Sequence, residues 1–131
     1  MKILFICKYN RFRSRVAETY LKEINKKIKI KSAGIIKGKP TPKTVIKIAK
    51  TLGIKIKGKP KPIKEKELES TDKIIITAND VPPIIFKRFK EKLIIWKIPD
   101  TTENNTKEIK RIIKMIIKKV DNLNKTFNKI K

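Results

Sequence analysis

One cysteine, one arginine and one serine near the N-terminus have the spacing of a site that could bind and attack a phosphoryl group. Residues 7–14 read CKYNRFRS, so five residues separate the thiol of Cys7 from Arg13. Backbone amides of such a short loop converge on one point, and a helix that follows adds positive potential from its N-terminus. A tetrahedral oxyanion fits there, and the same field should stabilise a thiolate. The loop is therefore a candidate anion cradle with an activated nucleophile.

The side chains of this loop indicate separate tasks. The planar guanidinium of Arg13 can grip two phosphate oxygens and hold the transferring group in line. Ser14 can donate a hydrogen bond to the sulfur, and Asn10 tolerates the left-handed conformation that a tight loop requires. We expect Cys7 and Arg13 to be catalytic. The residues expected to bind substrate are Lys8, Tyr9, Asn10, Arg11, Phe12 and Ser14.

The amino-acid composition excludes several kinds of catalytic and metal site. The 131-residue sequence has no histidine and one cysteine, so His-dependent triads, zinc-ligand clusters and an intrachain disulfide are excluded. A lone cysteine is typical of a reducing compartment, and no apolar run reaches the roughly 20 residues of a membrane-spanning helix. The sequence predicts a cytoplasmic protein with no membrane span, no metal and no cofactor, whose nucleophile is activated without imidazole.

Positive charge is spread along the whole chain. Lys and Arg number 36 against 12 Asp and Glu, which gives a net charge of +24. Such a surface attracts nucleic acids or anionic membranes nonspecifically, with an affinity that falls steeply in salt. Lysine alternates with isoleucine and no separate basic tail occurs. This pattern favours general enrichment, from genome composition or thermal adaptation, over a dedicated nucleic-acid role.

The hydrophobic pattern predicts the elements that must position the loop. Short continuous apolar runs are typical of strands buried in a parallel sheet, and a run that alternates with lysine is typical of an edge strand. The predicted strands are 2–7, an edge strand at 28–30 with a turn at 32–34, 74–77 and 93–98.

Apolar residues at helical spacing predict helices between and after these strands. The first helix begins at Ser14 and fades at Asn25. The second has Thr41 as its N-cap, a proline in its first turn and Gly53 as its stop. Residues 55–67 are expected to be a surface connection. The remaining helices are a short one from Pro82 to Lys90 and a long one from an Asn105–Glu108 capping box to Leu123.

This alternation of strands and helices predicts an α/β fold in three layers, with a four-stranded parallel sheet flanked by helices. The length fits one domain over residues 1–131. The phosphate-binding loop then lies between strand 1 and helix 1. In such folds the functional crevice lies beyond the carboxyl ends of the strands, so residues 32–41, 77–82 and 97–104 are expected to face it.

The loop and its surroundings resemble the low-molecular-weight protein tyrosine phosphatases and the related arsenate reductases. The shared features are Cys-x5-Arg-Ser after an N-terminal strand, Asn three residues past the Cys, and Val-Ala-Glu after the loop. The likeness continues in order at residues 32–34 (SAG), 52–54 (LGI) and 96–100 (WKIPD). The resemblance implies that Asp100, after the last strand, is the general acid.

The resemblance also implies a two-step hydrolysis of phosphomonoesters. The Cys7 thiolate attacks phosphorus while Asp100 protonates the departing oxygen, and a phosphocysteine forms. Asp100 then takes a proton from the water that releases phosphate. Backbone amides and Arg13 neutralise the equatorial oxygens in this scheme, so no metal is expected. The expected substrates are phosphorylated proteins, phosphotyrosine first among them, or small phosphomonoesters, with phosphate or sulfate as loop ligands.

The sequence departs from the family near the site. Tyr9 stands where many members have glycine, and Phe12 where they have a second cysteine, so Cys7 lacks a nearby partner for a protective disulfide. Residues 101–103, TTE, replace a proline and the aromatics that pack on phosphotyrosine in eukaryotic members. Tyr9 or Trp96 is a candidate for an aromatic wall, with core packing as the alternative for Trp96.

Other charged and polar residues near the loop have both a functional and a purely structural interpretation. Lys8, Arg11 and Arg15 are expected to surround the cradle, where they would favour substrates with additional anionic groups or act as ordinary surface charge. Asn79 and Asp80 precede two prolines and are interpreted as turn residues, with a role in the pocket as the less favoured alternative.

Two other functions stay open beside the phosphatase. One is an arsenate reductase that uses an external thiol, since the chain has no further cysteine to resolve an arsenylated thiol. The other is an oxyanion or nucleic-acid binding module whose loop has lost catalysis. The net charge and the residues at positions 9, 12 and 101 are the features that argue for this module.

Overall fold

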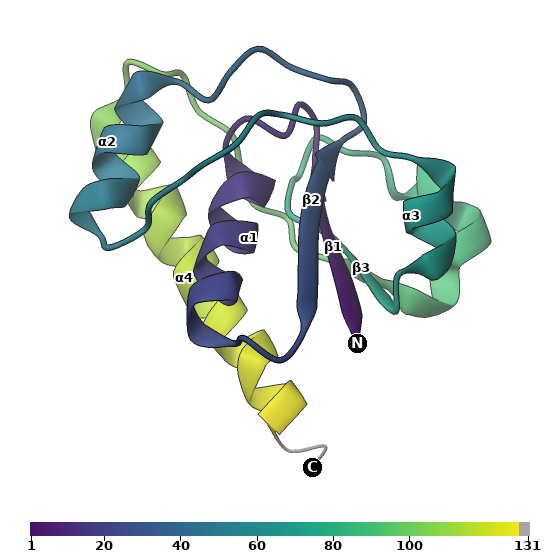
Figure 1. The fold of residues 1–131 in the computed structure, drawn as a ribbon. Helices are drawn as coiled ribbons and strands as arrows, with labels where there is room; N and C mark the ends of the chain where they lie inside the picture. The colour runs from purple at the N-terminus through teal and green to yellow at the C-terminus, as the bar shows by residue number, and fades with distance from the viewer. Residues whose placement is uncertain (129–131) are drawn as a thin grey trace.

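A central parallel sheet with helices on both faces forms the framework of the protein (Figure 1). The structure, a computed structural model, describes residues 1–128. The strands are β1 (Lys2–Cys7), β2 (Lys29–Gly34), β3 (Lys73–Ile76) and β4 (Leu93–Ile95). The helices are α1 (Arg13–Ile24), α2 (Lys43–Thr51), α3 (Glu65–Ser70), the 3-10 helix η1 (Pro83–Lys92) and α4 (Thr106–Asn128).

All four strands are parallel and stand in the order β2-β1-β3-β4. β1 therefore lies inside the sheet, and five of its six residues are buried. A continuous apolar strand is what a sheet covered on both faces requires. The predicted three-layer α/β fold is confirmed, and the loop after β1 lies at the carboxyl edge of the sheet, at the top of Figure 1.

Side chains that alternate along β1 enter two separate cores. Ile3 and Phe5 pack with α1, α2 and α4, whereas Leu4 and Ile6 pack under α3 and η1. All four are at most 2% exposed. Burial of each such side chain contributes about 1.5–3 kcal/mol, so the strand that carries the site loop is anchored from both faces.

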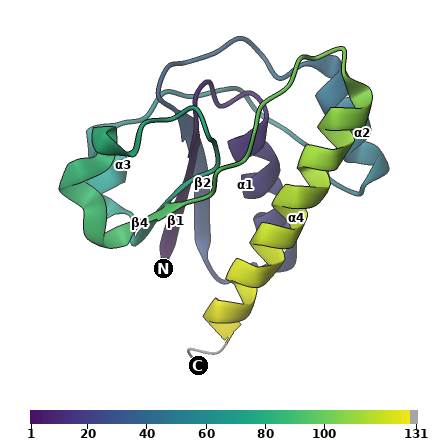
Figure 2. The same cartoon turned by 180° about the vertical axis from the view of Figure 1, so that it is seen from behind.

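α4 runs the length of one layer and packs on α1 and α2 (Figure 2). Its apolar stripe faces the core, as the helical spacing predicted: six of its residues are buried and Ile117 is half-buried. Asn105 caps the helix by accepting from the Glu108 N–H at 3.2 Å, but the Glu108 carboxylate pairs with Arg111, so only half of the capping box forms. Of the helices in residues 1–128, none combines the length and apolar character needed to cross a membrane.

Two strands differ in length from those predicted. β2 continues to Gly34 because it pairs with β1 in register as far as Cys7, so the turn expected at 32–34 is strand. Its alternating lysines, Lys29 and Lys31, are exposed, as expected for an edge strand. β4 pairs only as far as Ile95, opposite the last residue of β3, and not to residue 98.

The helices also depart from the prediction: α1 begins at Arg13, the helix expected from Pro82 to Lys90 is the 3-10 helix Pro83–Lys92, and α4 continues to Asn128. The larger differences concern α3 and the start of α2. The connection at 55–67 contains the start of α3, which the pattern missed because Leu68 is the one buried residue in this short helix. The predicted cap of α2 is wrong: Pro42 occupies the N-cap position, and the Thr41 hydroxyl has no hydrogen-bond partner within residues 1–128. Pro42 has an extended ψ of 141°, so the helix begins one residue later than expected.

Candidate active site

The loop from Cys7 to Ser14 folds back on itself at the carboxyl edge of the sheet. Asn10 has a φ of 55°, the left-handed conformation expected from its residue type. The segment after β2 is hydrogen-bonded to the backbone of the loop. Ile36 N–H donates to the Lys8 carbonyl at 3.1 Å, and Gly38 N–H donates to the Tyr9 carbonyl at 3.2 Å. The backbone of the loop is therefore fixed by its neighbours.

The sulfur of Cys7 lies beside the hydroxyl of Ser14. Their separation is 2.9 Å, and both residues are buried, with Cys7 only 2% exposed. Asn10 Nδ2 donates to Ser14 Oγ at 2.8 Å. Because the oxygen of Ser14 accepts this bond, its hydroxyl hydrogen is free to point at the sulfur. A hydrogen bond of this polarity favours the thiolate, the nucleophilic form.

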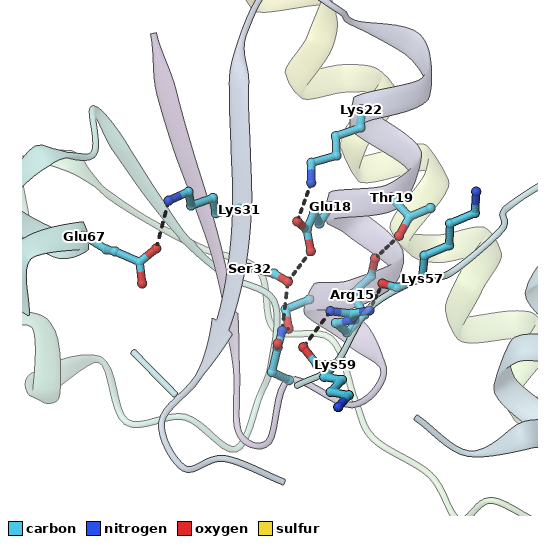
Figure 3. Close-up of polar contacts among 11 residues, drawn as sticks. Arg15, Glu18, Thr19, Lys22, Lys31, Ser32, Lys57, Lys59 and Glu67 are labelled. Carbon is cyan, nitrogen blue, oxygen red and sulfur yellow. Dashed lines mark hydrogen bonds and ion pairs between the residues drawn. The ribbon is translucent and has the colours of Figure 1, made fainter. Parts of the chain in front are cut away.

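A buried polar network continues from Asn10 across α1. Asn10 Nδ2 also donates to Ser32 Oγ at 2.9 Å, and the Ser32 hydroxyl donates to Glu18. Glu18 in turn accepts from Lys22 Nζ at 2.7 Å, as Figure 3 shows. On its other side, Asn10 Oδ1 accepts from the Lys61 N–H at 3.0 Å. Each hydrogen-bonding atom of the buried Asn10 amide is therefore partnered, which gives it one preferred orientation.

Arg13 is held by groups from the other strand ends. Its Nη1 donates to the Ile98 carbonyl at 2.9 Å, and its Nη2 donates to Asp80 Oδ1 at 2.9 Å. Asp100 Oδ2 lies 3.8 Å from the same Nη2. The Arg13 side chain is 3% exposed, so these bonds fix its guanidinium before any substrate arrives. Segments that follow β1, β3 and β4 thus meet at one arginine.

Asp100 stands at the entrance of the site. Its side chain is 49% exposed, and one carboxylate oxygen accepts from the Thr101 N–H at 2.9 Å while the other faces Arg13. This position leaves the carboxylate accessible to a bound molecule and to water.

A cavity of about 340 Å³ opens next to these groups. Its lining includes Tyr9, Phe12 and Arg13 from the loop, and Asp100 with residues 101–103 from the segment after β4. Such a volume suits a small ligand. Cys7, which is 2% exposed, is not one of the residues that line this cavity.

The three basic residues expected to surround the loop, Lys8, Arg11 and Arg15, lie in different environments. Arg11 lines the cavity, donates to the Lys39 carbonyl at 3.1 Å, and lies 3.9 Å from Glu103. Lys8 Nζ lies 5.2 Å from the centroid of the Tyr9 ring. The expectation for Arg15 is wrong: it is 4% exposed, and its guanidinium donates to the main-chain carbonyls of Lys57 and Lys59.

The two candidate aromatic walls have different environments. Tyr9 is 38% exposed and lines the cavity. Trp96 is 7% exposed, and its ring centroid lies 5.8 Å from that of Phe5 in the core, so the core-packing alternative for Trp96 is confirmed.

The structure brings the predicted residues together and adds others. Arg13 and Asp100 line the cavity, whereas Cys7 is 2% exposed and is not one of its lining residues. The side chains of Asn10 and Ser14 bond to each other and, through Ser14, to the Cys7 sulfur, so they support the loop. Asp80 was interpreted as a turn residue, yet its position after β3 could have indicated its contact with Arg13. Glu18 and Ser32 belong to motifs that the sequence shares with the family, but their contacts with each other and with Asn10 were not predicted, although Glu18 lies one helical turn after Ser14.

Solved structures share this fold along nearly their whole length. The low molecular weight phosphotyrosine phosphatase from Vibrio cholerae O395 superposes with a TM-score of 0.88 at 17% identity, covering 98% of this chain and 97% of that chain. YwlE arginine phosphatase from Geobacillus stearothermophilus gives a TM-score of 0.87 at 18% identity, covering 98% and 93%. An arsenate reductase from Archaeoglobus fulgidus gives 0.77 at 26% identity, covering 92% and 97%. No curated protein matches the chain by sequence.

The sequence itself shows the family. The family model described as low molecular weight phosphotyrosine protein phosphatase matches residues 2–131. This match includes the loop between β1 and α1 and every helix and strand described above. The resemblance inferred from the cysteine loop is thereby confirmed, and the chain belongs to the low molecular weight phosphotyrosine protein phosphatase family.

Proposed function

We propose that the protein hydrolyses phosphomonoesters through a phosphocysteine formed on Cys7, with Arg13 and Asp100 as the other catalytic residues and phosphotyrosine as the preferred substrate. The observation that carries this proposal is the position of the Cys7 sulfur, 2.9 Å from Ser14 Oγ, within the same short loop as the fixed guanidinium of Arg13. Membership in a phosphatase family supports the same reaction.

In the first step the sulfur attacks phosphorus. Loop amides and Arg13 stabilise the negative charge on the equatorial oxygens, and the S–P bond forms as the bond to the leaving oxygen breaks. Asp100, in its protonated form, transfers its proton to that oxygen. The alcohol or phenol then leaves through the open side of the cavity.

In the second step water replaces the sulfur. Asp100, now ionised, removes a proton from the water as its oxygen attacks phosphorus. The P–S bond breaks, phosphate is released, and the electron pair returns to the Cys7 thiolate. The partly exposed position of Asp100 supports both of its tasks, because the carboxylate meets bound substrate and solvent.

The mouth of the cavity supports a substrate with further negative charge. Arg11 lines the cavity beside Lys39, and Tyr9 offers a partly exposed ring for an aryl phosphate. These groups favour phosphotyrosine flanked by acidic residues over a phosphorylated side chain that carries positive charge. The arginine phosphatase named among the similar structures makes phosphoarginine the natural comparison substrate.

Hydrolysis of an aryl phosphate tests this function. The purified protein should release phosphate from p-nitrophenyl phosphate with a chelator present, and Cys7→Ser should abolish turnover because the hydroxyl is a far weaker nucleophile. Ser70→Ala, a change on α3 far along the chain from the loop, is the control and should keep full activity. Acid quenching during turnover should trap one phosphoryl group per chain by mass spectrometry. Undiminished turnover in Cys7→Ser would refute the assignment.

An arsenate reductase is the second candidate. The relative from Archaeoglobus fulgidus, at 26% identity, favours it. With Cys7 as the only cysteine of the sequence, this reaction needs an external thiol to resolve the arsenylated sulfur. Arsenite should then form from arsenate only when glutathione or a similar thiol is added. If the protein shows this thiol dependence and hydrolyses no phosphomonoester, arsenate reduction replaces phosphatase activity as the proposed function.

The cellular setting completes the proposal. We place the protein in the cytoplasm, since a lone cysteine suits a reducing compartment. Its charge of +24 supports a weak, nonspecific attraction to nucleic acids beside the catalytic role.

A further inference from the structure

Arg15 is a buried arginine whose partners are main-chain carbonyls. It is 4% exposed, and its guanidinium donates to the carbonyl of Lys59 at 3.1 Å and to that of Lys57. Within residues 1–128 it forms no ion pair, and its Nε has no hydrogen-bond partner. Burial of a charge is costly unless it is well compensated. The position of Arg15 therefore calls for an explanation beyond packing.

The two carbonyls belong to a segment that we call the strap, residues 57–61. The strap is part of the connection from α2 to α3, which passes α1 and the carboxyl edge of the sheet in Figure 1, and Figure 3 shows Lys57 and Lys59 beside Arg15. Gly58 separates them with a φ of 89°. A Cβ at Gly58 would lie 3.3 Å from Arg15 Nη2, so glycine lets both carbonyls reach one guanidinium.

The far end of the strap contacts the catalytic loop. The Lys61 N–H donates to Asn10 Oδ1 at 3.0 Å, and the Lys61 carbonyl accepts from the Gly34 N–H at 2.8 Å. With a donor fixed against Oδ1, the Nδ2 group of Asn10 must face the opposite way, toward Ser14 and Ser32. The strap thereby sets the orientation of the Asn10 amide.

That orientation decides where the Ser14 hydrogen goes. When Asn10 Nδ2 donates to Ser14 Oγ, the hydroxyl hydrogen is available to the Cys7 sulfur. If the amide turned over, Oδ1 would face Ser14 and compete for this hydrogen, and Nδ2 would oppose the Lys61 N–H. The thiolate would then lose its nearest donor.

We propose that Arg15 is a positioning residue for Cys7: it anchors the strap, so that the Lys61 N–H holds Asn10 in the orientation that directs the Ser14 hydroxyl at the sulfur. Arginine suits this task because its planar fork can bind two carbonyls at once, whereas lysine offers a single point of attachment. The inference rests on the proposed function only for its kinetic consequence, because the reactivity of the thiol can be measured without turnover.

Four variants separate this role from packing. Arg15→Met keeps the apolar stem and removes every donor, and Arg15→Lys keeps the charge. Lys61→Pro removes the N–H that holds Asn10 while Arg15 stays intact. Arg88→Met is the matched control, because Arg88 is 71% exposed and pairs with Glu65 on the surface. For each variant we would measure thermal stability, the rate of Cys7 alkylation by iodoacetamide from pH 5 to pH 9, and kcat and KM for p-nitrophenyl phosphate.

The proposal predicts a selective loss of thiol reactivity. Arg15→Met should slow alkylation at pH 6 by about tenfold, the size of one hydrogen bond to a charged group, with rates converging at pH 9. kcat should fall by a similar factor at pH 6, with KM within twofold. Arg15→Lys should lie between, and Arg88→Met should match the wild type. Lys61→Pro should reproduce Arg15→Met, and the double variant should add little, as expected for residues on one path.

Alkylation profiles that match the wild type in folded Arg15→Met and Lys61→Pro would overturn the proposal, even if both proteins were less stable. If Arg15→Met does not fold, the alkylation profile of Lys61→Pro tests the proposal, since this variant leaves the buried arginine paired. If neither variant folds, the profile of Arg15→Lys tests it, and a profile that matches the wild type would refute the proposal. A shifted profile in a protein whose wild type hydrolyses no phosphomonoester would refute the proposed function and support the role of Arg15.

Discussion

Two carboxylates compete for Arg13, and their distances indicate different tasks. Asp80 lies 2.9 Å from Nη2, whereas Asp100 lies 3.8 Å from it and is more exposed. Asp80 is thus the structural partner that holds the guanidinium in place. Asp100 is farther from the guanidinium and its side chain is 49% exposed, which suits the general-acid role that we propose for it.

Replacement of Asp100 tests the second task. Asp100→Asn should lower kcat for an alkyl phosphate by about 10²–10⁴-fold, because its poor leaving group needs the proton. The loss should be much smaller for p-nitrophenyl phosphate, whose phenolate leaves readily without it. Steady-state kinetics with both substrates gives the comparison, and Asp72→Asn, at the amino end of the sheet beside Lys2, is the control. Equal losses on both substrates would contradict a general-acid role.

The site residues that could be predicted from the sequence are those that lie together in one continuous loop. Cys7, Asn10 and Ser14 lie close in sequence, and their contacts follow from a tight turn before a helix. The partners that complete the site come from distant segments, such as Asp80 and the Lys61 N–H. A main-chain donor carries no residue-type signal, so the sequence could not identify it.

At the level of elements, the end of β2 shapes the loop. A Cβ added at Gly34 would lie 2.7 Å from the Tyr9 carbonyl carbon and 2.8 Å from the Asn10 nitrogen, both of which are backbone atoms that cannot easily move. Gly34→Ala should therefore displace the loop and lower kcat/KM by about tenfold or more. Gly53→Ala is the control, because its Cβ meets nothing within 4 Å although its φ is 82°.

The control should lose about 1 kcal/mol of stability from its left-handed backbone but keep its activity. Kinetics and chemical denaturation on the same samples separate the two effects. Full activity in Gly34→Ala would show that the loop tolerates a shift at this contact.

A second element-level contact joins α1 to α4 and predicts a pH dependence. Tyr20 Oη donates to Asp121 Oδ1 at 2.6 Å, and this hydrogen bond, together with burial and the charge of Asp121, raises the pKa of Tyr20 from 10.0 to about 12. A raised pKa in the folded state means that the phenol stabilises the fold fully below pH 10 and loses this contribution as pH rises through 12.

Tyr20→Phe should therefore be less stable than the wild type at pH 8 by about 1 kcal/mol, the typical net value of a hydrogen bond. The difference should shrink between pH 10 and pH 12. Urea denaturation across this range measures it, with Tyr9→Phe, at the cavity, as the matched control. A gap that stays constant to pH 12 would contradict the assigned contact.

Element order was predictable, but element ends were not. β1 and α4 have long, regular apolar patterns, and both form as expected. β4 ends early because its partner β3 has only four residues, a limit set by tertiary pairing that β4's own sequence does not carry. α3 has a single buried residue, Leu68, and one contact gives no period to recognise.

On the scale of the whole molecule, the net charge of +24 predicts binding to any polyanion at low salt. If 6–10 phosphates are contacted, affinity for labelled poly(U), a single strand, should fall by about 10²–10⁴-fold between 50 and 200 mM salt. Fluorescence anisotropy measures this slope, and an uncharged peptide nucleic acid of the same sequence, the control, should not bind. Tight binding that persists in high salt would instead indicate a dedicated nucleic-acid site.

The two outer strands have a consequence for a chain so rich in isoleucine. β2 presents Lys29 and Lys31 outward, and β4 offers only three residues for pairing. Exposed lysines on one side, of which Lys31 pairs with Glu67, and a short ladder on the other are features that disfavour edge-to-edge pairing of neighbouring copies. Concentrated solutions should consequently resist fibril growth, despite the strong tendency of Ile-rich segments toward cross-β stacking.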